Sequence, residues 1–291
     1  MRQLGMKLLW RWGPLLAGTH TIALVIGIKI SKKWARIWII QQVSNCPLIL
    51  IHGLGLCRHI WAPYVPALTA AGYEVLTYDL YGHGDGAPAP QAASLDLYAR
   101  QILALMNGRS IPRAHLVGFS IGGMINRRFA LDYPDRVATL AIWNSPHNRG
   151  ADAQIQVEAR AKKVLDEGSL ATLEPALERW FTPEFRAKNP QMLDRVRAWR
   201  RQVHALSYAG AAWVLANGVV ELVGAEYPRG IATQVLTCAH DTGSTPAMAN
   251  AIAEQLGAPA PHIIPDLQHL GLLERPDLFL PPLLNFLRET P

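Results

Sequence analysis

A serine between glycines is the first place in this chain where residue types and spacing indicate chemistry. Residues 118–122 have the sequence Gly-Phe-Ser-Ile-Gly; they follow the apolar run Ala114–Val117 and precede a helical pattern over Gly123–Asp132. A sharp turn between a strand and a helix exposes the Ser120 hydroxyl to a base, and glycines are needed there because a Cβ would crowd the turn. The pattern predicts Ser120 as a nucleophile, with an ordinary turn serine as the alternative.

A serine nucleophile requires a base, and the base requires an acid that orients it. After Ser120 the chain offers Asp241, which follows the β-rich run 233–239, and then His269, which follows the run 261–265. Because ligands bind beyond the carboxyl ends of parallel strands, we expect these three side chains to meet. A turn or helix N-cap role for Asp241 and a loop role for His269 are the alternatives.

Together these motifs resemble those of the α/β-hydrolase superfamily, over a span from about Pro47 to the C-terminus. The matching motifs are the oxyanion loop His52-Gly53-Leu54-Gly55, the Asp-x-x-Gly-x-Gly loop at 79–84, the nucleophile elbow at 118–123, the acid Asp241 and the base His269. Within the superfamily, the chain is most similar to cofactor-free carboxylesterases and 3-oxoadipate enol-lactonase-like hydrolases. The resemblance implies an α/β-hydrolase fold, a mostly parallel sheet flanked by helices, with an inserted helical cap.

The same resemblance implies a serine hydrolase that cleaves a carboxylic ester or lactone through an acyl-enzyme intermediate. Ser120 would attack the carbonyl while His269 takes its proton, and Asp241 would orient the imidazole. The backbone N–H groups of Leu54 and Ile121 would hold the oxyanion. No metal and no organic cofactor is expected, and the partner would be a small-molecule ester or lactone.

Three other functions are compatible with these residues: a carbon–carbon bond hydrolase of ring-cleavage products, a perhydrolase-type activity, and a ligand-binding protein on a hydrolase scaffold. A serine at the nucleophile position argues against haloalkane dehalogenase and epoxide hydrolase chemistry, for which the superfamily uses aspartate. Cys46, Cys57 and Cys238 lack the spacing of a CxxC or zinc motif. The sequence has no P-loop, and no Gly-x-Gly-x-x-Gly string follows the first predicted core strand.

The positive charge of the chain lies in its first quarter. The 291 residues carry a formal net charge of +6. All 22 acidic residues lie at or after Glu74, together with 20 of the 28 Lys and Arg residues, so this larger part of the chain has a net charge of −2. A near-neutral body does not predict nucleic-acid binding. Length and the 50% share of hydrophobic residues predict one large α/β domain or a core with an insertion.

Residues 1–43 form a basic and apolar leader that has three interpretations. The apolar stretch at 12–28 is near the lower limit for a membrane span, which favours a signal or an anchor with membrane contact through residues 1–30. The β-branched content instead favours two leading strands, Thr21–Ile30 and Ala35–Val43. An atypical or artificial leader is the third. An odd number of cysteines, three, does not indicate a disulfide framework, which favours a cytoplasmic location, with membrane association or export as the alternative. The oligomeric state is open.

Strand and helix patterns alternate through the rest of the chain. Strands are predicted at 47–52, 73–79, 114–117 and 137–143 and before Asp241, and Ser94 is a predicted N-cap for a helix over Leu95–Met106. Such alternation predicts a parallel sheet with both faces covered. We expect two core segments, 44–147 and 228–291, separated by a cap at 148–227.

The segment from Ala151 to Val223 contains no strand pattern and predicts four or five helices that would roof the pocket over Ser120. Thr182 and Asn189 each precede a proline, as is typical of helix starts. Arg195, Arg197, Arg200 and Arg201 are predicted to form a solvated helix face.

Candidate substrate contacts are aromatic and basic side chains near the predicted pocket, with packing as the alternative for the aromatic ones. The aromatic candidates are Trp143 and His147, just beyond a strand, and Trp180, Phe181, Trp199, Tyr208 and Trp213 in the cap. A lactone that carries carboxylates would need an arginine, for which Arg127, Arg128 and Arg149 are candidates.

Overall fold

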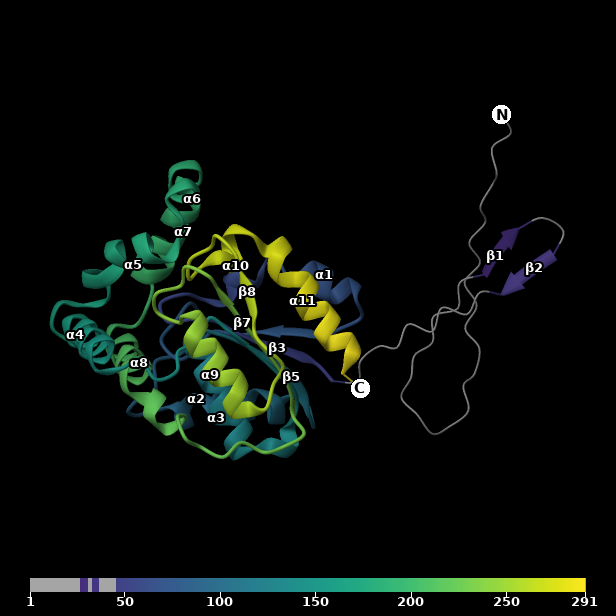
Figure 1. The fold of residues 1–291 in the computed structure, drawn as a ribbon, viewed down its shortest axis with the longest axis horizontal. Helices are drawn as coiled ribbons and strands as arrows, with labels where there is room; N and C mark the ends of the chain where they lie inside the picture. Colours follow the sequence, from purple (N-terminus) through teal and green to yellow (C-terminus); the bar gives the residue numbers. More distant parts are fainter. Residues whose placement is uncertain (1–26, 31–32, 37–45, 291) are drawn as a thin grey trace.

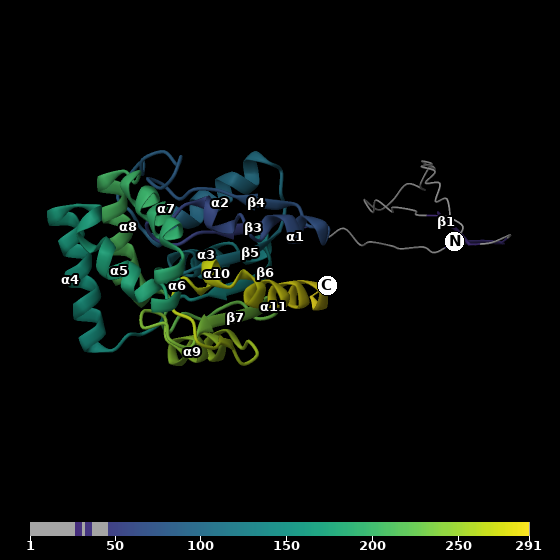
Figure 2. The same cartoon turned by 90° about the horizontal axis from the view of Figure 1, so that it is seen from above.

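A six-stranded parallel sheet forms the centre of the molecule (Figures 1 and 2). The computed structural model describes residues 27–30, 33–36 and 46–290. The strand order is β4-β3-β5-β6-β7-β8, and every neighbouring pair is parallel. The strands are β3 Leu48–Ile51, β4 Val75–Thr77, β5 Ala114–Phe119, β6 Val137–Trp143, β7 Ala232–Cys238 and β8 His262–Ile264. The predicted α/β fold with a mostly parallel sheet is confirmed.

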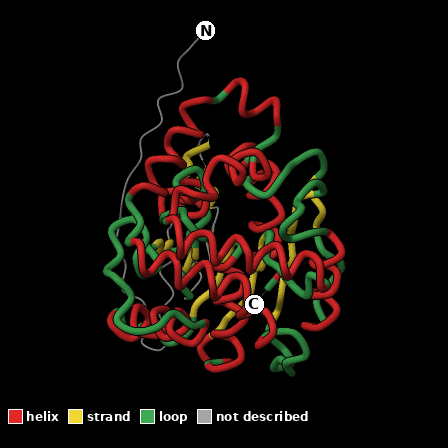
Figure 3. The backbone as a smooth tube through the Cα atoms, turned by 90° about the vertical axis from the view of Figure 1, so that its left-hand side faces the viewer, coloured by secondary structure: helices red, strands yellow, loops and turns green. Residues whose placement is uncertain are grey.

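Helices cover both faces of this sheet, as the red and yellow elements of Figure 3 show. Both faces of β3 and β5 are buried, which agrees with the continuous apolar sequence of β3 and with that of β5 apart from His115. On one face lie η1 Arg58–Trp61, α1 Val65–Ala70, α10 Gly271–Glu274 and α11 Pro276–Glu289. On the other face lie α2 Leu95–Gly108, α3 Ile121–Asp132 and α9 Pro246–Leu256; the short η2 Pro134–Arg136 leads into β6.

The chain between β6 and β7 is helical and lies at one end of the sheet (Figure 2). It comprises α4 Ala151–Glu167, η3 Ser169–Thr172, α5 Leu173–Trp180, α6 Pro183–Lys188, α7 Pro190–Arg201, α8 Ala205–Asn217 and η4 Gly218–Glu221. Local signals set its boundaries: Gly168 ends α4 with φ 91°, and the Thr182 hydroxyl accepts a bond from the Phe185 N–H at the start of α6. We call this segment, 151–221, the helical insertion.

The leader differs from the sequence-based expectation where it is described. β1 Gly27–Ile30 and β2 Lys33–Arg36 form an antiparallel hairpin in a sheet of their own, apart from the six-stranded sheet. β1 lies within the predicted strand Thr21–Ile30, and β2 begins at Lys33, two residues before the predicted start of the second strand at Ala35. The other leader residues lie outside the described part. Over the described ranges no single helix has the length and hydropathy of a membrane span, and only the bent pair of α7 with α8–η4 meets both criteria jointly.

Candidate active site

The backbone at Ser120 has an unusual conformation that depends on three neighbouring glycines. Ser120 has φ 58° and ψ −117° at the junction of β5 and α3, a region that costs energy for any residue with a side chain. A Cβ on Gly122 would lie 2.5 Å from the Ile51 carbonyl oxygen, one on Gly123 would lie 2.6 Å from the Ser145 Cβ, and one on Gly118 would collide with the Gly122 carbonyl. The tight turn therefore requires glycine at these positions and directs the hydroxyl away from the sheet.

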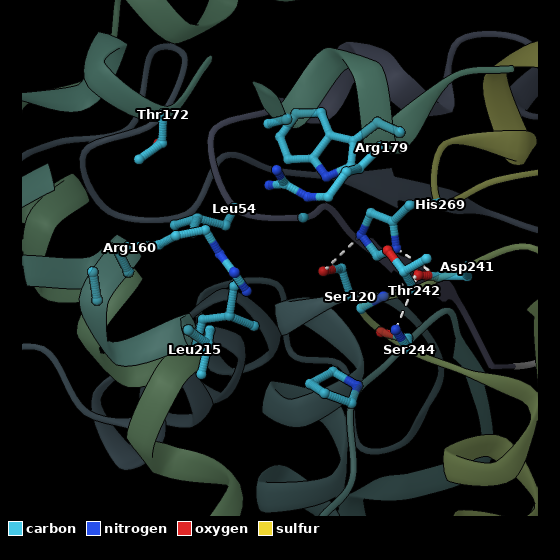
Figure 4. Close-up of a pocket in the computed structure, with 18 of the residues that line it drawn as sticks. Leu54, Ser120, Arg160, Thr172, Arg179, Leu215, Asp241, Thr242, Ser244 and His269 are labelled. Atoms are coloured by element: carbon cyan, nitrogen blue, oxygen red, sulfur yellow. Dashed lines mark hydrogen bonds and ion pairs between the residues drawn. The ribbon is translucent and has the colours of Figure 1, made fainter. Parts of the chain in front are cut away.

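Ser120, His269 and Asp241 form a continuous chain of hydrogen bonds (Figure 4). His269 Nδ1 lies 2.6 Å from Asp241 Oδ2, and His269 Nε2 lies 3.2 Å from Ser120 Oγ. A carboxylate can only accept, so Nδ1 carries the proton and Nε2 accepts from the serine hydroxyl. This is the order of groups that can remove a proton from a serine as it attacks a carbonyl.

The Asp241 carboxylate is held by donors on three further residues. Its Oδ1 accepts from the backbone N–H groups of Gly243 and Ser244, each at 2.9 Å, and its Oδ2 also accepts from Asn144 Nδ2 at 2.9 Å. With His269, four donors fix the orientation of this buried carboxylate. Sequence reasoning missed Asn144, although it follows β6 directly, at the same edge of the sheet as the other site residues.

Two backbone N–H groups beside Ser120 have no acceptor among the described residues. Ile121 is the first residue of α3, so its N–H has no intrahelical partner. Leu54 belongs to the loop after β3 and lines the same pocket as Ser120. These are the two groups that the sequence predicted as an oxyanion hole.

The Leu54 loop is fixed by a buried histidine. His52 Nε2 accepts from the Leu80 N–H at 3.0 Å, so its Nδ1 donates to the Gly53 carbonyl oxygen at 2.8 Å. Burial lowers the pKa of His52 to about 4, and burial with the nearby His52 lowers the pKa of His83 to about 3. Both imidazoles are therefore neutral at pH 7. His52 joins the loops that follow β3 and β4, whereas His83 bonds to the Tyr81 carbonyl oxygen within its own loop.

A cavity of about 250 Å³ opens between Ser120 and the helical insertion. The core side is formed by loops that carry Gly53, Leu54, Ser120, Asp241, Ser244 and His269; we call these the pocket floor. The opposite side, the pocket roof, combines apolar residues of α4, α5 and α8 with four arginines. Its members include Val157, Val164, Ala176, Trp180, Tyr208 and Leu215.

Roof and floor are joined through the His269 loop. The Leu270 N–H donates to the Trp180 carbonyl oxygen at 2.8 Å, and the N–H and hydroxyl of Thr182 donate to the Glu274 carboxylate at 2.8 and 2.7 Å. Burial raises the pKa of Glu274, and the Thr182 bonds counteract this. The position of His269 is thus coupled to the end of α5.

Of the aromatic residues predicted to contact the substrate, some line the pocket and others do not. Trp180 lines the pocket, and its ring centroid lies 6.1 Å from that of His269. The expectation for Trp143 is wrong: it is 0% exposed and packs against Trp61, Tyr64 and Phe279, because its side chain projects into the core under the sheet.

Two further expected contacts lie away from the pocket. His147 pairs with Gln255 at 3.1 Å and does not line the cavity. Trp213 is 53% exposed, because it lies on the outer side of α8. Of the other cap aromatics, Tyr208 lines the pocket, whereas Phe181 and Trp199 belong to the buried core cluster.

The arginines also differ from expectation. Arg200 is 1% exposed and lines the pocket, so the predicted solvated face is wrong at this position. It packs over Tyr208, and a Cβ on Gly55 would collide with its guanidinium. Of the candidates for a carboxylate partner, Arg149 lines the pocket, whereas Arg127 is buried against the Pro146 carbonyl and Arg128 is paired with Asp132 and Glu221.

In the part of the chain that the structure describes, no group of three or more His, Cys, Asp or Glu side chains is placed to hold a metal ion. The site therefore consists of a hydroxyl, an imidazole, a carboxylate and two backbone N–H groups, next to a basic roof.

Comparison with protein families gives a match over most of the chain. The model of the "Alpha/beta hydrolase family" matches residues 48–281. An (E)-2-((N-methylformamido)methylene)succinate hydrolase of Acinetobacter baylyi is 28% identical over 253 residues, which cover 86% of this chain and 94% of that protein. A 3-oxoadipate enol-lactonase of the same organism is 26% identical over 82% of this chain and 87% of its own length.

Solved structures with the same fold include enzymes. The enol-lactonase from Burkholderia xenovorans superposes with a TM-score of 0.73 at 27% identity, covering 84% of this chain and 93% of that one. An esterase from Thermogutta terrifontis, solved with malate bound, has a TM-score of 0.74 at 25% identity, covering 84% and 90%.

Proposed function

The chain belongs to the alpha/beta hydrolase family, and from this premise we propose that it is a serine hydrolase that cleaves a carboxylic ester or lactone through an acyl-enzyme intermediate. The observation that carries the proposal is the bonded chain from Ser120 through His269 to Asp241. Hydrolase activity is supported by two relatives that are named as a hydrolase and an enol-lactonase and that align with this chain over 94% and 87% of their own lengths.

Each group has one task in the proposed reaction. Ser120 Oγ attacks the carbonyl carbon while His269 Nε2 takes its proton, and Asp241 stabilises the imidazolium that forms. The N–H groups of Leu54 and Ile121 bind the oxyanion; loss of one such donor typically costs about 10²–10³ in rate. His269 then returns its proton to the leaving alcohol oxygen. In the second half, His269 deprotonates the water that attacks the acyl-enzyme and gives this proton to Ser120 Oγ as the carboxylic acid is released.

The strained backbone at Ser120 supports the nucleophile role. The φ and ψ of Ser120 together lie in a strained region, which persists where the surrounding packing enforces it, and such outliers gather at functional sites. Here the glycines at 118, 122 and 123 allow the close packing that enforces it.

The cavity and the relatives support a small substrate. At about 250 Å³ the cavity is just below the ~300–1,000 Å³ typical of small-molecule sites. The names of similar proteins include an enol-lactonase, a hydrolase of a succinate derivative and an esterase with malate bound. We therefore propose a short acyl group or a small lactone, enclosed by the helical insertion as a cap that excludes water.

Hydrolysis of p-nitrophenyl esters of increasing acyl length tests the proposal, with Ser120→Ala as the comparison. We expect turnover of short acyl esters by the wild type and a loss of about three or more orders of magnitude in kcat for the variant. Covalent labelling of Ser120 by a fluorophosphonate, detected by mass spectrometry, is the second readout. Equal activity of the two proteins would show that Ser120 is not the nucleophile.

Other outcomes of this experiment separate the alternatives. Labelling of Ser120 together with failure to hydrolyse any ester would favour a carbon–carbon bond hydrolase, to be assayed with a vinylogous diketone. Peroxide-dependent halogenation in acetate would indicate perhydrolase activity. A single slow turnover with retained product would indicate a ligand-binding protein.

A further inference from the structure

Four guanidinium groups line a cavity that contains a single carboxylate. The arginines are Arg149, Arg160, Arg179 and Arg200, all in the pocket roof or directly beside it. The carboxylate is Asp241, which already binds His269 and three other donors. Among the described residues no acidic side chain forms a salt bridge with any of the four arginines. The pocket therefore carries an excess of positive charge next to Ser120.

Two of the four arginines have structural partners. Arg149 donates to the Leu215 and Ala216 carbonyl oxygens at 2.9 and 3.3 Å. Arg200 donates to the Ser169 carbonyl oxygen at 3.1 Å and stacks on Tyr208 with its Cζ 4.6 Å from the ring centroid. These contacts hold the loop and helix ends of the insertion together, so both side chains have a role in packing.

Arg160 and Arg179 differ from that pair. Arg160 extends from α4 and has no hydrogen bond or ion pair to any described residue, and Arg179 extends from α5 and bonds only to the Pro175 carbonyl of its own helix, at 2.8 Å. Both are half-buried and point into the space that separates their helices from Ser120 (Figure 4). Of their ten N–H donors, only one, on Arg179 Nη1, has an acceptor among the described residues.

This arrangement has an electrostatic cost without a ligand. Burial lowers the pKa of Arg160, and the neighbouring Arg179 lowers it further; burial also lowers the pKa of Arg179, an effect that the nearby Glu178 partly counteracts. Two like charges in a half-buried pocket repel one another, and partly lost hydration makes each a stronger binder of an anion. An anion between them would offset both effects.

On the basis of the proposed hydrolase function, we propose that Arg160 and Arg179 form a carboxylate subsite, so that the substrate is an ester or lactone that carries a free carboxylate group. A guanidinium binds a carboxylate through two parallel N–H···O bonds, and two guanidiniums on separate helices can bind its two oxygens from different sides. The small cavity places such a carboxylate a few bonds from the scissile carbonyl, as in a monoester of a short dicarboxylic acid.

The decisive comparison uses two esters of equal chain length that differ in one charge. Monomethyl glutarate carries a carboxylate where methyl pentanoate carries a methyl group, and a pH-stat follows hydrolysis of both. We expect kcat/KM of the wild type to favour the charged ester by about tenfold or more, because each tenfold is only about 1.4 kcal/mol of differential binding. A ratio near one in the wild type would overturn the subsite.

Variants locate the effect. Arg160→Gln and Arg179→Gln should each lower the charged-to-neutral ratio by about tenfold, and Arg160→Lys, which keeps the charge without the planar fork, should lower it less. Arg195→Gln is the matched control, because Arg195 is an exposed arginine of α7 outside the pocket; its ratio should equal that of the wild type. Equal ratios in Arg160→Gln and Arg195→Gln would overturn the role of Arg160.

A binding measurement separates failure of the subsite from failure of the hydrolase proposal. Calorimetry of glutarate with Ser120→Ala requires no turnover. We expect binding that weakens about tenfold when Arg160→Gln is added and that does not change when Arg195→Gln is added. Absence of binding with ester hydrolysis intact would overturn the subsite alone. Binding without any ester hydrolysis would support the subsite and overturn the proposed reaction. Thermal melting confirms that each variant is folded.

Discussion

The core side and the roof of the pocket differ in whether their charged side chains have partners within the protein. On the core side, charged groups have partners within the protein: Asp241 accepts four bonds, and Arg58 binds both Asp79 and Asp85 at 2.6 Å. On the roof, Arg160 and Arg179 form no salt bridge with an acidic side chain among the described residues. The charged groups of the core side are paired without a ligand, and the N–H groups of Leu54 and Ile121 lack an acceptor there among the described residues, whereas on the roof two charged side chains have hydrogen-bonding capacity left over.

This difference matches two separate physical demands. A catalytic acid–base chain must be oriented before the substrate arrives, so its hydrogen bonds are satisfied internally. A recognition site must keep hydrogen-bond donors free for its ligand, and these unpaired donors lower the stability of the protein without ligand. The division also explains how one core can serve many substrates, since a change in the insertion alters recognition without altering the chemistry.

The two sides remain mechanically connected. Trp180, which follows Arg179 in α5, accepts a backbone bond from Leu270, which follows His269. A substrate that moves the end of α5 would therefore act directly on the loop of the proposed base.

The largest expected effect is on the core side. His269→Ala should lower kcat by about 10⁵–10⁶, because the nucleophile, base and acid act as one unit. For the same reason the Ser120→Ala, His269→Ala double variant should be about as inactive as either single variant. Steady-state kinetics with short esters measures this, and His240→Ala, at an exposed histidine, is the control. Effects that multiply in the double variant would show that the two residues act independently.

Acidification should destabilise the core through three buried neutral histidines: His52 and His83 in loops, and His115 in β5, whose pKa burial lowers to about 4. The pKa of His52 is lowered to about 4 and that of His83 to about 3, both by burial, whereas an unfolded histidine titrates near 6.5. As pH falls below about 6.5 the unfolded state binds protons that the folded state does not. The unfolding free energy should therefore fall as pH decreases from about 6.5 to 4, by up to about 1.4 kcal/mol per pH unit for each histidine.

Urea denaturation at pH values from 5.0 to 7.5 measures this slope. The range above pH 5 keeps the carboxylates ionised, so that histidine protonation dominates. An unfolding free energy that does not change between pH 6.5 and 5 would contradict the assignment of His52, His83 and His115 as buried neutral histidines.

A smaller effect on catalysis is expected at Asn144, the donor to Asp241 that follows β6. Asn144→Gly removes this donor, and glycine adopts the local φ of 45° without strain. We expect kcat to fall about tenfold with little change in KM, because Asn144 positions the acid and does not touch the substrate. Burst kinetics can assign the loss to acylation. A change in KM alone would place Asn144 in substrate binding.

The smallest effect concerns stability and has opposite signs on the two sides. Arg160→Gln should raise the melting temperature by about 1–3 °C, because it removes a half-buried charge that lacks an acidic partner. Arg58→Gln should lower it by a few degrees, because it leaves the buried Asp79 carboxylate without its charged partner. Differential scanning calorimetry without ligand measures both. A decrease for Arg160→Gln would mean that this side chain stabilises the insertion.

Much of the core could be predicted from local sequence. The strand at 137–143 appears as an apolar run of the observed length, the predicted strand at 114–117 lies within β5, and Ser94 and Thr182 are recognisable helix caps. The positions of Ser120, Asp241 and His269 after predicted strands, together with the resemblance to the α/β-hydrolase superfamily, named the three residues that the structure brings together. These features are readable because each depends on contacts within a few residues, or on the rule that parallel strands end at one edge.

The tertiary structure alone decided which side chains face the pocket. Trp143 ends a strand that is buried on both faces, so alternation could not tell core from cavity. Arg200 lies among three other arginines in α7, and only the packing of that helix against Tyr208 and the Gly55 loop shows that it points inward. Arg160 and Arg179 lie on different helices, and their common orientation toward Ser120 depends on how the insertion folds over the core, which no local pattern records.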